Sequence, residues 1–149
     1  VVGVDWCDAT AYCAWAGKRL CGEVGGGPAD INDLMNVQNN EWFRACTQGG
    51  IKNFPYGLNY NGNRCNTLES GLNDLAPVGS FANCEGGYPG LFDMSGNVWE
   101  WTNACNNMGE CRRRGGSFFS TGNTASCLID SVRPRDFRTD HHGLRCCSD

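Results

Sequence analysis

The chain has 149 residues, which fits one domain and leaves little room for two. Seven Phe, five Trp and four Tyr residues can build a core, while 21 glycines and five prolines indicate a loop-rich fold rather than a helical bundle. A formal net charge of −4 at pH 7 argues against nucleic acid and anionic membranes as partners. We expect the run Arg112-Arg113-Arg114 to be solvated surface, and no stretch is apolar enough for a membrane span.

Eleven cysteines are spread along the chain. No Cys-x-x-Cys pair occurs, and the only histidines, His141 and His142, are neighbours, which disfavours zinc and thioredoxin-type sites. Spread-out cysteines in a compact chain indicate disulfides, and therefore a secreted or cell-surface protein. Because the count is odd, at least one thiol is free, bridges to another chain or has lost its partner.

A first helix is predicted directly after Asp5. Asp5 can cap this helix, and Asp8 three residues later gives a capping-box-like arrangement. Gly17 is expected to end it, because glycine readily adopts the left-handed conformation of a helix end. The residues expected on its apolar face are Ala9, Tyr12, Cys13 and Ala16.

The rest of the chain predicts fewer helices and more loops. Apolar residues at roughly helical spacing predict a second helix between about Asn32 and Cys46. Beyond it, short strands such as Val98 to Trp101 and Gly116 to Phe119 are separated by long loops. We therefore predict one α+β domain over residues 1–149, with the helices first.

One segment is highly specific: Gly90 to Trp101 reads Gly-Leu-Phe-Asp-Met-Ser-Gly-Asn-Val-Trp-Glu-Trp. Together with others in the same order, it resembles the formylglycine-generating enzyme family, also called the sulfatase-modifying-factor domain. The resemblance covers essentially the whole chain and implies a variant of the C-type-lectin fold. The family's N-terminal portion is missing before Val1, so we expect other residues or another chain to cover the strand edge left there. The other matching segments are 4–9, 12–20, 41–46, 54–57, 76–81, 114–118 and 143–146.

The resemblance implies a calcium site between Asp93 and Glu100. At the matching positions the family binds calcium through the side chains of Asp93 and Glu100 and the carbonyls of Gly96 and Val98. This set suits calcium, which combines carboxylates with main-chain carbonyls. The alternative is structural: Glu100 caps a turn and Asp93 lies at a strand end.

The resemblance implies a second calcium site, whose first two ligands are an Asn residue and the main-chain carbonyl of the residue after it. These positions match Asn66 and Thr67. The segment that carries the remaining ligands, Leu68 to Leu75, is shortened here. Calcium is therefore the one cofactor expected.

The resemblance also implies two disulfides, Cys13–Cys146 and Cys46–Cys127. Cys105 and Cys111 enclose a short loop and are expected to pair locally. Cys65 and Cys84 are the next expected disulfide pair. Two of the remaining three cysteines can pair with each other, and the sequence does not choose among them. These three are Cys7, Cys21 and Cys147.

The family's catalytic pair is replaced. Active members oxidise a cysteine of a sulfatase with copper(I) held by two thiolates, a ligand set that suits this soft ion. After Gly115-Gly116-Ser117, the two thiolate positions are Ser120 and Ala125, so we expect no copper and no oxidase chemistry. Relatives that use iron need three histidines, and the two here are expected to be exposed loop residues, so no iron is expected.

What remains is a rigid frame with variable loops, which commonly carry ligand surfaces. The favoured hypothesis is a secreted, calcium-stabilised, non-catalytic module that binds an extracellular protein or a glycan. The alternatives are a structural subunit that joins copies of itself, and a copper-dependent oxidase with a rearranged site that uses Cys127 or Cys147. The residues of the possible ligand surface are Ser120, Arg133, Arg135, Phe137 and Arg138.

Overall fold

The first helix forms where the sequence predicts it. The computed structural model describes residues 1–33 and 35–148, and its helix α1 spans Trp6–Trp15. The Asp5 side chain accepts a hydrogen bond from the Asp8 N–H, and the Asp8 side chain accepts one from the Asp5 N–H, so the capping box is confirmed. Only Ala9 and Cys13 of the expected apolar face are buried; Tyr12 and Ala16 are exposed, so that part of the prediction was wrong.

The second helix is shorter than predicted. Helix α2 spans Glu41–Thr47, and Asn40 caps it by accepting a hydrogen bond from the Phe43 N–H. The described residues between 32 and 40 form turns instead. The asparagine and aspartate side chains there hydrogen-bond to nearby main-chain and side-chain groups, which favours turns over a helix.

A four-stranded mixed sheet lies at the centre, in the order β4-β3-β2-β5. β2 (Trp99–Cys105) includes most of the strand predicted from Val98 to Trp101, and β5 (His142–Leu144) runs parallel to it. β3 (Glu110–Arg114) and β4 (Asp130–Pro134) are antiparallel neighbours. A separate pair joins β1 (Arg19–Leu20) to β6 (Cys146–Cys147).

The strand predicted from Gly116 to Phe119 was wrong, because these residues form a turn after β3. Both Gly115 and Gly116 have positive φ, and a Cβ on Gly116 would lie 2.7 Å from the Thr124 carbonyl oxygen. Such a backbone leaves the sheet and folds back on itself. The remaining short helices are 3-10 turns: η1 (Leu68–Ser70), η2 (Ala82–Cys84) and η3 (Gly122–Ala125).

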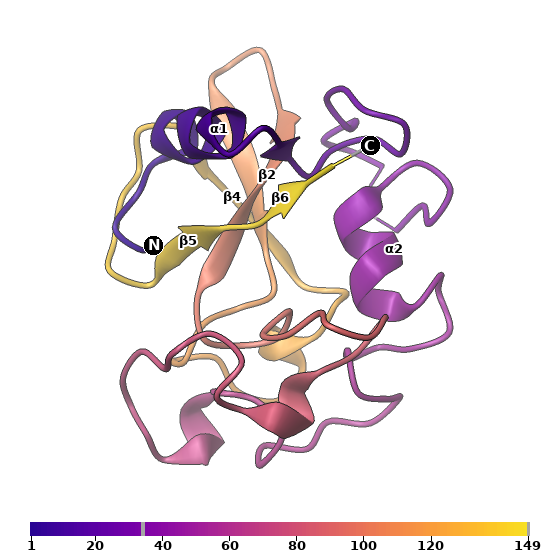
Figure 1. Cartoon of the computed structure of the whole chain (residues 1–149), viewed down its shortest axis with the longest axis vertical. Helices are drawn as coiled ribbons and strands as arrows, with labels where there is room; N and C mark the ends of the chain where they lie inside the picture. Colours follow the sequence, from indigo (N-terminus) through magenta and orange to yellow (C-terminus); the bar gives the residue numbers. More distant parts are fainter. Residues whose placement is uncertain (34, 149) are drawn as a thin grey trace.

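Figure 1 shows the strands and α1 in the upper half of the molecule and most of the loops in the lower half. α2 lies along one side between the two halves, and the N-terminus lies beside β5. There the Gly3 N–H donates to the His142 carbonyl, so residues at the start of the chain lie against the outer edge of β5.

Five disulfides hold this loop-rich chain. All four expected pairs are present, namely Cys13–Cys146, Cys46–Cys127, Cys65–Cys84 and Cys105–Cys111. The fifth joins Cys21 to Cys147, which resolves the choice that the sequence left open. Cys7 is exposed and is the one cysteine outside a disulfide in the described part of the chain.

The arginine run is buried, contrary to the expectation of a solvated surface. Arg112, Arg113 and Arg114 form most of β3, and none of them is more than 6% exposed. Arg112 forms an ion pair with Asp130 on β4, and the Arg114 guanidinium lies over the rings of Trp42 and Phe43. Each charge is therefore matched by an acid or an aromatic face inside the sheet region.

Gly96, in the loop before β2, permits a close approach to the backbone at Asn66. It has φ +72°, and an added Cβ would lie 2.3 Å from the Asn66 carbonyl oxygen. Gly17 has φ +70° with nothing within 4 Å, so it serves as a matched control. We predict that Gly96→Ala lowers the free energy of unfolding by about 3 kcal/mol and Gly17→Ala by about 1 kcal/mol. Chemical denaturation measures both values, and equal losses would contradict the role of this contact.

Candidate functional site

The segment after β3 contains Ser120 and Ala125, the two residues that stand where the family has its thiolates. The Ser120 hydroxyl accepts a hydrogen bond from the Ser117 N–H at 3.0 Å, and the Ser120 carbonyl accepts one from the Leu68 N–H. Ala125 is completely buried at the end of η3. A hydroxyl and a methyl group offer no soft sulfur ligand, so these residues do not fit copper(I).

Aromatic rings form a belt beside this loop. The rings of Phe119 and His141 lie 5.7 Å apart, those of His141 and His142 5.2 Å, and those of His142 and Phe137 5.2 Å. The Arg133 guanidinium lies 5.6 Å from the Phe137 ring. Phe119, one residue before Ser120, thus lies against His141, and Phe137 lies against His142.

His142 is a buried member of this belt, contrary to the expectation of an exposed loop residue. Its side chain is 0% exposed, and its two ring nitrogens contact Arg113 and Thr139. Burial, together with the positive charge of Arg113, lowers the pKa of His142 to about 3. Burial also lowers the pKa of Arg113 to about 10, and its guanidinium lies 4.4 Å from the centre of the Trp99 ring. At neutral pH the pair is therefore a neutral imidazole beside a charged guanidinium.

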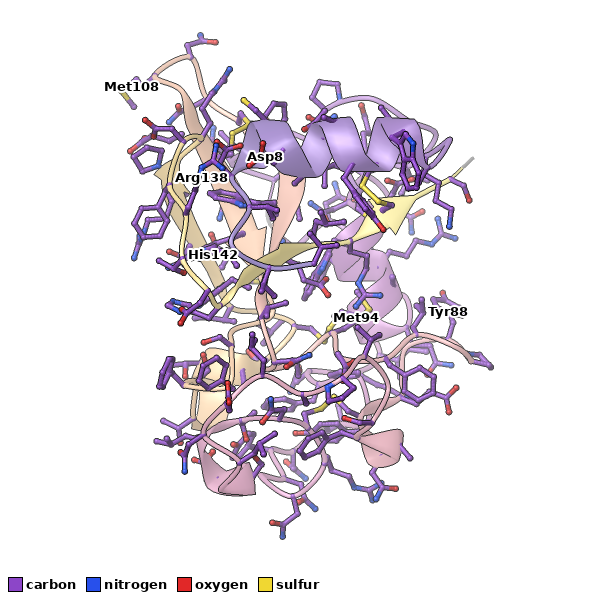
Figure 2. All side chains as sticks on the ribbon, turned by 60° about the vertical axis from the view of Figure 1, so that its left-hand side comes forward. Asp8, Tyr88, Met94, Met108, Arg138 and His142 are labelled. Carbon is purple, nitrogen blue, oxygen red and sulfur yellow. A yellow bond between two sulfur atoms is a disulfide. The ribbon has the colours of Figure 1, made fainter. Side chains whose placement is uncertain are left out.

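The other expected ligand-surface arginines have intramolecular partners. Arg138 forms ion pairs with Asp5 at 2.6 Å and Asp8 at 2.7 Å, and Figure 2 shows Arg138 beside Asp8 at the start of α1. Arg135 lies over the Trp6 ring. Arg138 thus stabilises the acidic first turn of a helix. Of the expected ligand-surface residues, Phe137 belongs to the aromatic belt and Arg133 lies beside it.

The two carboxylates of the expected calcium site line one pocket of about 500 Å³. Arg145 donates two hydrogen bonds to Glu100, at 2.6 and 2.8 Å, and the Trp42 indole donates a third at 2.7 Å. One oxygen of Asp93 accepts from the Gly79 N–H. Burial, and then the negative charge of Glu100, raise the pKa of Asp93. Lys18 and Arg145 line the same pocket, so its two acidic side chains face two cationic ones.

The residues of this first site fit a calcium ion in ligand type. Asp93 keeps one carboxylate oxygen that accepts no hydrogen bond in the described part of the chain. Glu100 can contribute only a remaining lone pair, because Arg145 and Trp42 already donate to both of its oxygens. Asp93 is therefore the residue whose charge an added cation would compensate most.

The residues of the second expected calcium site, Asn66 and Thr67, do not fit a calcium ion in the same way. The Asn66 amide nitrogen donates to the Asp74 carbonyl and to Asn97, and the amide oxygen accepts from Ser70. The Thr67 carbonyl accepts from the Ser70 N–H. Asn66 and Thr67 are buried and act as an internal cross-link between loops.

Comparison with known proteins identifies the family. The model described as the sulfatase-modifying factor enzyme 1-like domain matches residues 1–149. The chain belongs to this family. Inactive C-alpha-formylglycine-generating enzyme 2 of Mus musculus is 34% identical over 168 residues, which cover 99% of this chain and 48% of that protein. Formylglycine-generating enzyme of Mus musculus is 38% identical over 117 residues, which cover 68% of this chain and 26% of that protein.

The family fold is also found among solved structures. PvdO from Pseudomonas aeruginosa superimposes with a TM-score of 0.71 at 23% identity, covering 97% of this chain and 59% of that one. CarF does so with a TM-score of 0.65 at 21% identity, covering 97% and 66%. The C-type-lectin-like fold expected for a sulfatase-modifying-factor domain is therefore confirmed. The chain spans about half the length of the inactive relative that it matches.

Sequence reasoning missed the partners of Glu100 and the role of the arginine run. Arg145 stands one residue before a disulfide-bonded cysteine, and Trp42 lies in a matching segment of the sulfatase-modifying-factor domain. The position of Arg145 between two short strands and next to a disulfide is the one local signal that its charge has a partner within the fold. Nothing in the local sequence predicted that His142 would contact Arg113, 29 residues away.

The lowered pKa of His142 makes stability depend on pH. Between pH 6.5 and 3 the unfolded chain binds a proton that the folded protein excludes, so stability is full above pH 6.5 and falls as the pH falls. We predict a loss of about 2 kcal/mol between pH 7 and pH 5, measured by urea unfolding. His142→Gln should remove this loss, whereas the control His141→Gln should keep it. A loss that persists in His142→Gln would contradict this assignment.

Proposed function

We propose that the protein is a non-catalytic, calcium-stabilised, extracellular binding module of the formylglycine-generating enzyme family. The observation that carries the proposal is the pair Ser120 and Ala125. The hydroxyl of the first is hydrogen-bonded within its own loop and the second is a buried methyl, so neither supplies a copper ligand. Whole-chain similarity to a protein named as an inactive enzyme supports the same conclusion.

The disulfide content supports an extracellular location. Ten of the eleven cysteines are paired, which requires an oxidising compartment. No helix in the described residues is long and apolar enough to cross a bilayer.

The pocket of Asp93 and Glu100 supports the calcium part of the proposal. Asp93 and Glu100 would hold the ion with the carbonyls of Gly96 and Val98, and the ion would join the loop that contains Asp93 to β2. Without a cation, Asp93 keeps a buried charge whose pKa is raised. Calcium would therefore stabilise the fold by compensating this charge.

A structural subunit is the second candidate, and Cys7 favours it. This thiol is exposed on α1 in a chain whose other cysteines are oxidised, so it can link to another chain. The oxidase with a rearranged site has no support in the form expected from the sequence. Both thiols that it would use are in disulfides, Cys127 with Cys46 and Cys147 with Cys21.

Metal titration tests the proposal. We predict that calcium raises the midpoint of thermal unfolding of the unreduced protein, and that Asp93→Asn removes this effect. Because Asn carries no buried charge, Asp93→Asn should be at least as stable as the original chain when a chelator is present. Differential scanning calorimetry measures both quantities.

Measurement of copper(I) binding is the second test of the proposed function. Native mass spectrometry of Cys7→Ser, which lacks the free thiol, should detect no tightly bound copper(I). Stoichiometric copper in this variant, or oxidation of a cysteine-containing peptide, would contradict the non-catalytic assignment. A calcium effect that survives in Asp93→Asn would contradict the calcium site alone.

A further inference from the structure

A second pocket of about 500 Å³ lies between two loops, residues 53–60 and 123–129. It shares no lining residue with the pocket of Asp93 and Glu100. None of its lining residues, all within the described part of the chain, is charged. An ion would lose hydration there without gaining an opposite charge, so a ligand of this pocket is neutral.

Three polar side chains line the pocket without a protein partner. The amides of Asn59 and Asn123 and the hydroxyl of Ser126 make no hydrogen bond to any residue that the structure describes. An amide presents a donor and an acceptor close together, and a hydroxyl can act as either. This set can therefore hold the neighbouring hydroxyl and amide groups of a polar but uncharged ligand.

The pocket also has an aliphatic wall. Leu58 is 61% exposed and Leu128 37% exposed, and Ile129 lies next to Leu128. A ligand with hydroxyl groups alone would leave these side chains in poor contact, whereas a ligand with a methyl group would cover them. The lining therefore favours a small ligand that has both polar groups and a methyl group.

The two loops are fixed to each other before any ligand binds. The Cys127 N–H donates to the Asn53 carbonyl at 2.8 Å, and the Asn53 amide donates to the Leu58 carbonyl at 3.1 Å. The disulfide between Cys46 and Cys127 anchors the second loop to the end of α2. Binding therefore needs little ordering of the protein.

We propose that this pocket binds a neutral saccharide that carries an acetamido group. The asparagines and Ser126 would bind its hydroxyl and amide groups, and its methyl group would lie against Leu58 and Leu128. An extended peptide fits less well, because the pocket is lined by loops and offers no strand edge to pair with a peptide main chain. This inference rests on the proposed function, since it names the ligand class of the binding module.

Nuclear magnetic resonance titration of the unreduced, ¹⁵N-labelled chain with N,N′-diacetylchitobiose tests the inference. We expect this disaccharide to shift the amide signals of residues 53–60 and 123–129. Cellobiose, which has the same linkage without acetamido groups, should bind at least about fivefold more weakly. Asn123→Ala should weaken chitobiose binding roughly five- to tenfold. The control Asn83→Ala, an exposed asparagine outside the pocket, should bind it unchanged.

Several results would overturn the inference. These are no shifts in the two loops, equal affinity for both disaccharides, no effect of Asn123→Ala, or tighter binding of the neutral peptide acetyl-Gly-Leu-Gly-amide to the same loops. Calcium-dependent unfolding of the same samples separates this failure from that of the proposed function. A chain that responds to calcium, takes up no copper and ignores chitobiose would retain the proposed function and lose only this ligand.

Discussion

The buried carboxylate of Glu100 is the interaction on which the rest of the structure depends. It lies at 4% exposure on the central strand β2 and accepts hydrogen bonds from Trp42 of α2 and from Arg145, which lies between β5 and β6. Arg145 donates a further hydrogen bond to the Phe92 carbonyl at 2.7 Å, next to Asp93. One ion pair therefore joins the central sheet, the second helix and the loop of the expected calcium site. Because Glu100 is buried, loss of Arg145 leaves an uncompensated charge inside the fold.

This arrangement explains how a member of a catalytic family can keep its frame without its catalytic pair. Ser120 and Ala125 lie in a turn after β3 that contributes a buried methyl and local hydrogen bonds. The disulfides and the Glu100 ion pair hold the strands and α2 independently of these two positions. On the proposed function, the frame would persist without the family's chemistry, and its loops would bind another ligand.

Elements with a strong local signal could be predicted, and those fixed by distant contacts could not. The capping box of α1 is encoded within four residues, and the family resemblance gave the fold and two of the five disulfides. The strand at residues 110–114 was missed because three consecutive arginines are typical of a solvated surface, whereas Asp130 and the rings of Trp42 and Trp99 make their burial possible. His142 was misplaced for the same reason, since its contacts come from other elements. The Asp93 and Glu100 positions came from the motif, but the Arg145 ion pair that determines their charge did not.

A double-mutant cycle of Glu100→Gln and Arg145→Met, measured by urea unfolding with a chelator present, tests the central role of this ion pair most directly. Arg145→Met should lower the free energy of unfolding by about 3–5 kcal/mol, because it leaves the buried charge of Glu100 without a partner. Glu100→Gln should lower it by less, because the Arg145 side chain is 21% exposed. The double variant should lose less than the sum of the two, with a coupling energy of at least about 2 kcal/mol. A coupling energy near zero would contradict the account, because it would mean that Glu100 and Arg145 stabilise the fold independently of each other.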